Sequence, residues 1–290
     1  MNKNFWKKVG WTGMTLLPMV VSLATQILIT VAVMVVIAMT VGIRGALSGV
    51  TSPYLLEQEI LDAVMGSMTM ILLLYHVLAL VGFGVWYYLG CGRPKPGKPG
   101  RVFSGRALPV TILIGLFMCI SATAFLSAAQ YIVPEMIEQY EEMMELAGLG
   151  TDLLAILASV LIAPIGEELL CRGLTFHYAW KVVEGMPNRR AAFWIANSFQ
   201  ALMFGIMHGN LVQGSYAFAM GLGLGWLRWR YNSLYPSMLA HFIVNFSSTV
   251  FVGFLFYIIP ENLAVYTLMT VVGIVFILLV MKWDRKKEPE

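Results

Sequence analysis

Residues 14–43 read MTLLPMVVSLATQILITVAVMVVIAMTVGI, and no charged side chain interrupts this run. An α-helix needs roughly 20 apolar residues to cross the hydrocarbon core of a bilayer. Of the 290 residues in the chain, 59% are hydrophobic and only 12% are charged, whereas a soluble domain carries roughly 25% charged residues. The chain is therefore predicted to be an all-α protein that crosses a membrane several times.

The apolar residues fall into blocks, and we expect about eight transmembrane helices, one for each block. The blocks lie near residues 14–43, 63–91, 107–133, 153–180, 191–209, 214–231, 234–259 and 263–282. The first block is far longer than the core of a signal peptide, so we interpret it as a retained span. Residues 44–62 and 134–151, between blocks, are expected to form short interfacial helices.

The segments between the blocks differ in the sign of their charge. Basic residues precede the first block and follow the second, fourth, sixth and eighth: Lys3, Lys7, Lys8, Arg93, Lys95, Lys98, Arg101, Arg106, Lys181, Arg189, Arg190, Arg228, Arg230, Lys282, Arg285, Lys286 and Lys287. Acidic residues gather after the third block, between Glu135 and Asp152. The positive-inside rule then predicts that both termini face the cytoplasm.

The overall composition limits the possible partners and the host membrane. The net charge of +3 is too small to indicate a nucleic-acid partner, and the lipid bilayer is the expected surroundings. The short, Met-rich chain without long loops favours a bacterial plasma membrane. Three scattered cysteines, Cys91, Cys119 and Cys171, indicate neither a disulfide framework nor a zinc site.

Two adjacent carboxylates interrupt the fourth block, in the stretch Glu167-Glu168-Leu-Leu-Cys-Arg172. Glu168 and Arg172 are four residues apart, share a helix face and can form an ion pair. Glu167 points about 100° away and has no cation within its own helix. A carboxylate of this kind can take a proton from water and return it later, although an ion pair that only ties helices together is the plainer interpretation.

Two more blocks contain polar side chains that suit a buried site. The fifth ends in Phe204-Gly-Ile-Met-His208, and a histidine at a span end is often only interfacial. The seventh contains His241-Phe-Ile-Val-Asn245, whose two polar residues lie on one helix face. They could stabilise an oxyanion or form a hydrogen-bonded pair between helices.

Other polar and small residues in the blocks are interpreted as packing residues. Asn197 and Gln200 are expected to hydrogen-bond between helices, and Gly221 and Gly225 are expected to allow close helix packing. The remaining histidines are interpreted more simply: His76 as a packing or channel-facing residue and His177 as an interfacial one.

Together, the three motifs resemble those of the CPBP family of intramembrane proteases. This family includes the type II CAAX prenyl endopeptidases, also called Ras-converting enzymes, and bacterial proteins linked to bacteriocin processing or self-immunity. The pattern is Glu-Glu-x-x-x-Arg, then Phe-x-x-x-His, then His-x-x-x-Asn, on successive helices. The resemblance covers residues 150–250, while the other spans match only in general character.

The resemblance implies a metal-independent peptidase without a cofactor, acting on a membrane-associated peptide or protein. By motif position, Glu167 would activate the water, and His208 would hold or polarise it. His241 and Asn245 would bind the oxyanion. Glu168 and Arg172 would orient the site or touch the substrate.

Three alternatives remain open from the sequence. Glu167, His208 and His241 also make a plausible ligand set for catalytic zinc, although no His-Glu-x-x-His motif is present. A non-enzymatic scaffold or bacteriocin-immunity protein could bind a peptide or lipid in the same cavity. A transporter fits less well, because the polar residues form one cluster and not a track across the bilayer.

The domain organisation follows from the same motifs. We expect a single membrane domain over residues 1–290, with a catalytic core at 150–250 formed by the fourth to seventh spans. Residues 1–149 would supply three flanking spans, and residues 260–290 the eighth span with a basic cytoplasmic tail. Counting along the spans separates Glu167 from His208, so we expect the fifth span either to start beyond the membrane edge, which Arg189 and Arg190 allow, or to tilt strongly. A single site is then expected to open to the cytoplasmic side.

Overall fold

A computed structural model describes residues 3–49, 52–91, 105–147, 152–250 and 252–285. Within these residues every regular element is helical, and no strand is present. The all-α class predicted from the sequence is therefore confirmed.

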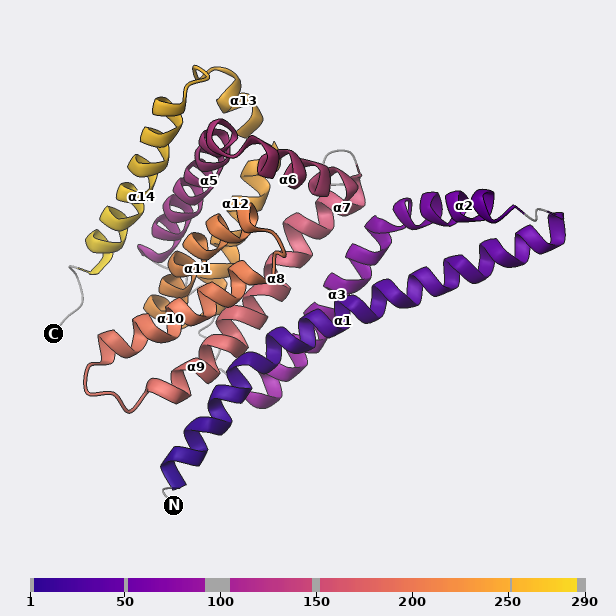
Figure 1. Cartoon of the computed structure of the whole chain (residues 1–290). Helices are drawn as coiled ribbons and strands as arrows, with labels where there is room; N and C mark the ends of the chain where they lie inside the picture. The colour runs from indigo at the N-terminus through magenta and orange to yellow at the C-terminus, as the bar shows by residue number, and fades with distance from the viewer. Residues whose placement is uncertain (1–2, 50–51, 92–104, 148–151, 251, 286–290) are drawn as a thin grey trace.

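Long helices make up most of the structure (Figure 1). Their bounds are α1 (Lys3–Ser48), α3 (Met68–Gly90), α5 (Ala107–Ile132), α10 (Arg189–Ile206), α11 (Leu211–Tyr231), α12 (Leu234–Val250) and α14 (Leu263–Arg285). The fourth predicted span consists of consecutive pieces: α7 (Leu153–Leu157), the π-helical turn η1 (Ala158–Ile162), α8 (Ala163–Glu168), the π-helical turn η2 (Leu169–Thr175) and α9 (Phe176–Val183). The remaining short helices are α2 (Pro53–Met65), α6 (Pro134–Leu146) and α13 (Val252–Tyr257).

Five helices of the described chain are long and apolar enough to cross a membrane. They are α1, α3, α5, the continuous helix Leu153–Val183 and α14, which match the first four predicted spans and the last. α10, α11 and α12 occupy the other three predicted ranges without meeting this criterion: α12 has 17 residues, and α10 and α11 each contain two arginines and several polar side chains. The five spans support an integral membrane protein, while the count of eight stays a prediction.

The predicted interfacial helices are recovered unequally. α6 occupies most of 134–151, and it starts with a proline at its first position, which suits a helix N-terminus. Residues 44–62 do not form one helix, because α1 continues to Ser48 and α2 begins only at Pro53. The break falls at Gly49, whose φ of 71° is a left-handed conformation that glycine adopts easily.

The continuous helix Leu153–Val183 lies between two groups of helices (Figure 1). On one side, α10 packs against α11, and α5 packs against α12 and α14. On the other side, α1 and α3 contact η2, and α3 also contacts α8. The far end of α1 projects away from the bundle together with α2 (Figure 1). The central helix can therefore present side chains to both groups.

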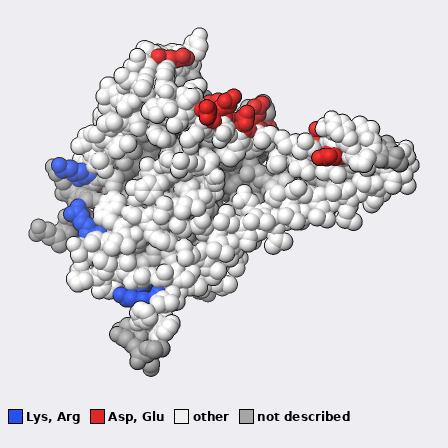
Figure 2. Space-filling model, in the orientation of Figure 1, with Lys and Arg blue, Asp and Glu red and all other residues white. Residues whose placement is uncertain are grey.

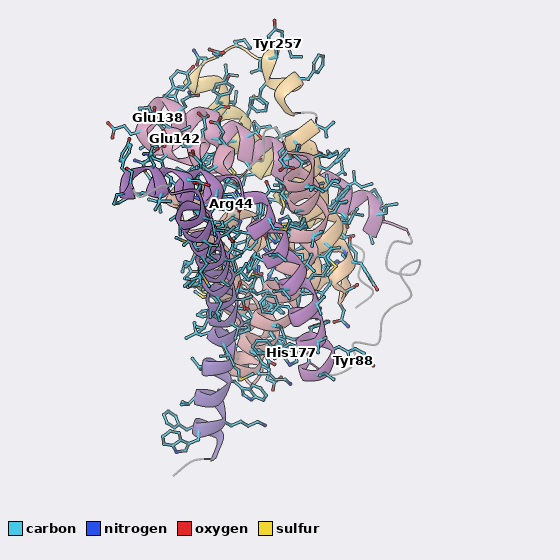
Figure 3. All side chains as sticks on the ribbon, turned by 90° about the vertical axis from the view of Figure 1, so that its right-hand side faces the viewer. Arg44, Tyr88, Glu138, Glu142, His177 and Tyr257 are labelled. Carbon is cyan, nitrogen blue, oxygen red and sulfur yellow. The ribbon has the colours of Figure 1, made fainter. Side chains whose placement is uncertain are left out.

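Charged side chains separate toward two ends of the molecule. Figure 2 shows acidic groups over the end where α2, α6 and the start of α14 lie, and basic groups at the opposite end. Figure 3 shows Glu138, Glu142 and also Arg44 toward one end and His177 toward the other, while the interfacial position of His177 stays a prediction. The predicted basic loop at 93–101 and the tail lysines at 286 and 287 lie outside the described residues.

Asp152 joins the start of the central helix to α3. Its Oδ1 accepts hydrogen bonds from the backbone N–H groups of Leu154 at 2.8 Å and Ala155 at 3.4 Å, which caps α7. Its Oδ2 accepts a hydrogen bond from Thr69 Oγ1 at 2.8 Å. The bond from Thr69, followed by the one from Leu154, lowers the pKa of this carboxyl group.

This cap predicts a pH-dependent stability. Because the pKa of Asp152 is lower in the folded than in the unfolded chain, its contribution is present above the unfolded value of about 3.9 and is lost as the pH falls through the folded value. In detergent, the Tm of the wild type should therefore exceed that of Asp152→Asn at neutral pH, and the gap should close in acid. A gap that is constant from pH 7 to pH 3 would contradict this assignment.

Candidate active site

Residues from all three sequence motifs meet at α8, where the central helix carries its two carboxylates. Glu168 and Arg172 are fully buried, while the side chain of Glu167 is 21% exposed. Arg172 Nη1 donates to Glu168 Oε1 at 2.9 Å, so the predicted ion pair within one helix is confirmed. Glu167 points elsewhere and makes no hydrogen bond to its own helix in the described structure.

α12 brings His241 to both carboxylates. The His241 ring is 3% exposed, and its Nδ1 lies 3.0 Å from Glu168 Oε1. Its Nε2 lies 3.6 Å from Glu167 Oε2, which is close but beyond direct hydrogen-bond distance. A continuous polar chain therefore runs from Arg172 through Glu168 and His241 to Glu167.

The other α12 residue of the motif, Asn245, makes a different contact. Its Nδ2 donates to the backbone oxygen of Ser159, in η1, at 2.9 Å. The side chain is half-buried. Asn245 thus lies against the same central helix as His241, but beside a stretch nearer the N-terminal end of that helix.

Phe204 connects the histidine of the second motif to the rest of the site. Its ring centroid lies 4.9 Å from that of His208 and 5.6 Å from that of His241, both edge-on. The guanidinium carbon of Arg172 lies 4.2 Å from the centroid of the same ring, a cation–π contact. The structure thus places His208 and His241 around one aromatic ring, a role for Phe204 that the sequence did not show.

The turn after α10 explains how His208 reaches this position. α10 runs strongly inclined to α14 (Figure 1), and the tilt of the fifth predicted span in the membrane stays a prediction. His208 Nδ1 lies 2.7 Å from the backbone oxygen of Phe204, which fixes the ring at the helix end. Two residues after His208, Asn210 Nδ2 lies 3.9 Å from Met143 Sδ of α6. The turn that carries His208 therefore contacts α6, the helix rich in glutamates.

Asn197, Gln200 and the α11 glycines lie behind the site and hold α10 to α11. Asn197 Nδ2 donates to Leu222 O, and Gln200 Nε2 donates to Gly221 O, both at 2.9 Å. A Cβ atom at Gly225 would lie 1.8 Å from Asn197 Oδ1. Both packing predictions, hydrogen bonds between helices and close approach at glycine, are confirmed.

The remaining histidines and cysteines are not part of this cluster. His76 is buried in α3 at 8% exposure, with its ring 5.1 Å from that of Tyr75, and it is near enough to Glu167 for an electrostatic interaction. Cys171 is fully buried. Among the described residues, no three His, Cys, Asp or Glu side chains converge closely enough to hold a metal ion.

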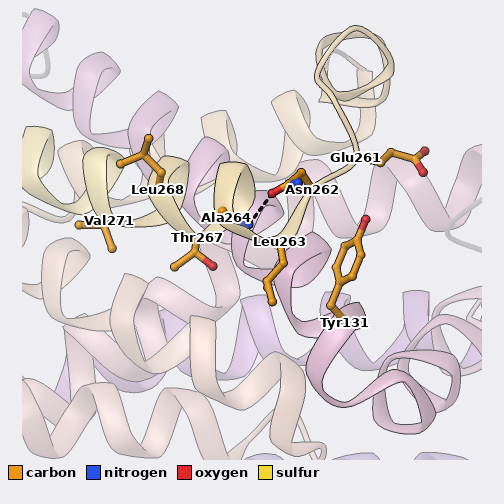
Figure 4. A pocket seen from close by; sticks show the side chains of 8 residues that line it. All are labelled: Tyr131, Glu261, Asn262, Leu263, Ala264, Thr267, Leu268 and Val271. Atoms are coloured by element: carbon orange, nitrogen blue, oxygen red, sulfur yellow. Dashed lines mark hydrogen bonds between the residues drawn. The ribbon is translucent and has the colours of Figure 1, made fainter.

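A surface groove lies apart from the carboxylates (Figure 4). The end of α5 and the segment leading into α14 form its walls: Tyr131, Glu261, Asn262, Leu263, Ala264, Thr267, Leu268 and Val271. Asn262 Oδ1 accepts a hydrogen bond from the N–H of Ala264 at 2.8 Å, which caps α14. No residue of the three motifs lines this groove, so we do not assign it to the site.

The fold and the cluster together define a class of protein. It is a helical membrane protein in which two carboxylates of α8, one imidazole of α12 and one from the turn after α10 gather at one site. Such a set of groups can exchange protons with a water molecule, because the surrounding helices separate the groups from lipid.

A comparison with known protein families refines this class. Residues 149–247 match the family model described as "Type II CAAX prenyl endopeptidase Rce1-like". The match contains all three motifs and covers about a third of the chain. Over these residues the chain is therefore similar to the CPBP/CAAX proteases, a family of peptidases. Neither a search of curated proteins nor a search of solved structures gave a significant match.

The close approach at Gly225 predicts a large effect of one added methyl group. Gly225→Ala should destabilise the protein by about 1–3 kcal/mol, because the new Cβ displaces the amides of Asn197 and Gln200. Thermal unfolding in detergent measures the effect. Gly82→Ala is the matched control: it also lies within a helix, but its new Cβ would meet nothing within 4 Å, so its Tm should be unchanged or higher. Equal Tm values for the two variants would refute the packing argument.

Proposed function

We propose that this protein is an intramembrane endopeptidase that hydrolyses a peptide bond in a membrane-associated peptide or protein through a water molecule activated by Glu167. The observation that supports this most is the separation of roles between the two adjacent carboxylates. Glu168 is buried and neutralised by Arg172, whereas Glu167 is partly accessible and faces His241. Of the two, Glu167 is therefore the carboxylate free to take a proton from water.

The distance between Glu167 and His241 suits a bound water. At 3.6 Å, the carboxylate oxygen and Nε2 are too far apart for a direct bond, but one water molecule can contact both. Glu167 would accept a proton from that water and later deliver it to the leaving amine. His208, which lies against the same Phe204 ring as His241, would hold or polarise the same water.

Glu168 has an orienting role in this proposal. Its Oε1 takes the Nδ1–H of His241, which leaves Nε2 directed toward Glu167. A carboxylate that holds an imidazole in this way fixes the orientation of the ring. Since Glu168 and Arg172 are both fully buried, the geometry favours orientation of the site over contact with the substrate.

Oxyanion stabilisation is assigned to α12. His241 and Asn245 lie one helical turn apart, and both side chains face the central helix. A hydrogen-bond donor aimed at a developing oxyanion typically contributes a factor of ~10²–10³ to the rate. The substrate carbonyl would then bind between α8 and α12, with its oxygen toward α12.

Replacing Glu167 tests the proposal. Glu167→Gln should lower kcat by about 10²–10⁴-fold, because the amide neither accepts nor returns the proton. The measurement is cleavage of membrane peptides by purified protein, together with the set of peptides that accumulates uncut in cells carrying the variant. Glu184→Gln is the control, because Glu184 is exposed and pairs only with Lys181 at 3.2 Å in the described structure.

The alternative function is an outcome of the same experiment. A scaffold or bacteriocin-immunity protein that binds a peptide or lipid in this cavity would keep its cellular phenotype in the Glu167→Gln variant. Retention of that phenotype, with no cleaved peptide in either strain, would replace the peptidase proposal.

Metal independence is a separate prediction. Cleavage in detergent should be unaffected by EDTA, since the proposed water is activated by a carboxylate and two imidazoles. Activity that disappears with the chelator and returns with added Zn²⁺ would show instead a zinc site built on Glu167, His208 and His241.

A further inference from the structure

The central helix lacks one backbone hydrogen bond just before its carboxylates. In η1 the bonds run back five residues, and the N–H of Ala163 donates to the oxygen of Ala158. In the same pattern, the N–H of residue 164 would donate to the oxygen of Ser159. Residue 164 is proline, which has no N–H. The Ser159 carbonyl is therefore left without a main-chain donor in that series.

A side chain from another helix supplies the missing donor. Asn245 Nδ2 donates to the Ser159 oxygen at 2.9 Å. Away from water, a carbonyl without a donor is strongly unfavourable, and within a membrane it needs a partner inside the protein. A proline in a membrane helix is tolerated when a neighbouring helix satisfies the freed backbone group in this way.

Asn245 and His241 then hold α12 to the central helix at two levels. Asn245 bonds on the N-terminal side of Pro164, and His241 bonds to Glu168 on its C-terminal side. Glu167 lies between these two levels. One contact on each side of Pro164 fixes the position of the central helix along its axis and its rotation relative to α12.

We propose that Asn245 is a positioning residue, whose amide replaces the backbone hydrogen bond removed by Pro164 and thereby places Glu167 against His241. The proposal deepens the proposed function and rests on it for the effect on turnover; the effect on stability is independent of any activity. The Asn245 amide has two hydrogens, and because Ser159 takes one, a single hydrogen is left to face an oxyanion.

The two roles of Asn245 differ in how they depend on Pro164. If the amide repairs the helix, an alanine at position 164 provides an N–H for Ser159 and makes Asn245 less necessary. If the amide only binds the oxyanion, the loss of Asn245 has the same effect whichever residue occupies position 164. A double-mutant cycle between the two positions separates these cases.

The experiment compares the wild type, Asn245→Ala, Pro164→Ala and the double variant in detergent. Removing Asn245 should lower the Tm by roughly 2–4 °C in the wild type and by much less when residue 164 is alanine. With a cleavable membrane peptide, the fold-loss of kcat caused by Asn245→Ala should also be smaller in the Pro164→Ala background, with KM unchanged.

Asn197→Ala is the matched control. Its amide also donates to a backbone oxygen at 2.9 Å, that of Leu222, but this bond joins α10 to α11. Its shift in Tm should therefore be the same with proline or alanine at position 164, because the two sites share no partner.

Equal Tm shifts for Asn245→Ala in the two backgrounds would overturn the proposal. If Pro164→Ala does not fold, the single variant still decides, since an amide that contacts only the oxyanion would leave the Tm of the substrate-free protein unchanged. If the Tm shifts of the two substitutions are coupled but the wild-type protein cleaves no peptide, the peptidase function is refuted and the positioning role remains.

Discussion

The Glu168–Arg172 ion pair lies in a part of the molecule from which both water and lipid are excluded. A buried charge without its partner is strongly destabilising, so neither residue tolerates displacement of the other. Glu168 Oε1 is shared between Arg172 and His241, and the guanidinium group of Arg172 covers the Phe204 ring. One ion pair within a single helix therefore sets the position of α12 and of the end of α10, which carry the rest of the site.

This dependence accounts for the asymmetry between two neighbouring glutamates. Residues that adjoin on a helix point in different directions, so one can be committed to structure while the next stays available. Glu168 meets a cation one turn later on its own face, and Glu167 meets none there. Glu168 is thus neutralised by its partner, whereas Glu167 is left partly accessible beside His241.

Much of the fold could be predicted from the sequence, because a bilayer imposes simple rules of length and polarity. The apolar block at 107–133 became α5 almost to the residue, and the block at 153–180 became one continuous helix. The extension of α1 to Ser48 was missed, because the apolar run ends at Arg44 and Gly45, and the helix nevertheless continues through both. The π-helical turns around α8 could not be foreseen either, because they depend on contacts with other helices and not on local propensity.

The candidate site was predictable to a similar depth. The pairing of Glu168 with Arg172 follows from a spacing of four residues, and the cluster of Glu167 with His241 followed from the motifs. Two features were out of reach. Phe204 acts through the faces and edges of its ring, and Ser159 acts through a main-chain oxygen that looks the same at every position of a sequence.

The length of α1 has a consequence for the surroundings of the protein. Its 46 residues extend over about 70 Å, whereas the hydrocarbon core is about 30 Å thick. A helix of this length must lean from the membrane normal or protrude from the core, and its far end with α2 forms an arm beside the bundle (Figure 1). Because α1 also contacts η2, this arm is attached directly to the helix that carries the carboxylates.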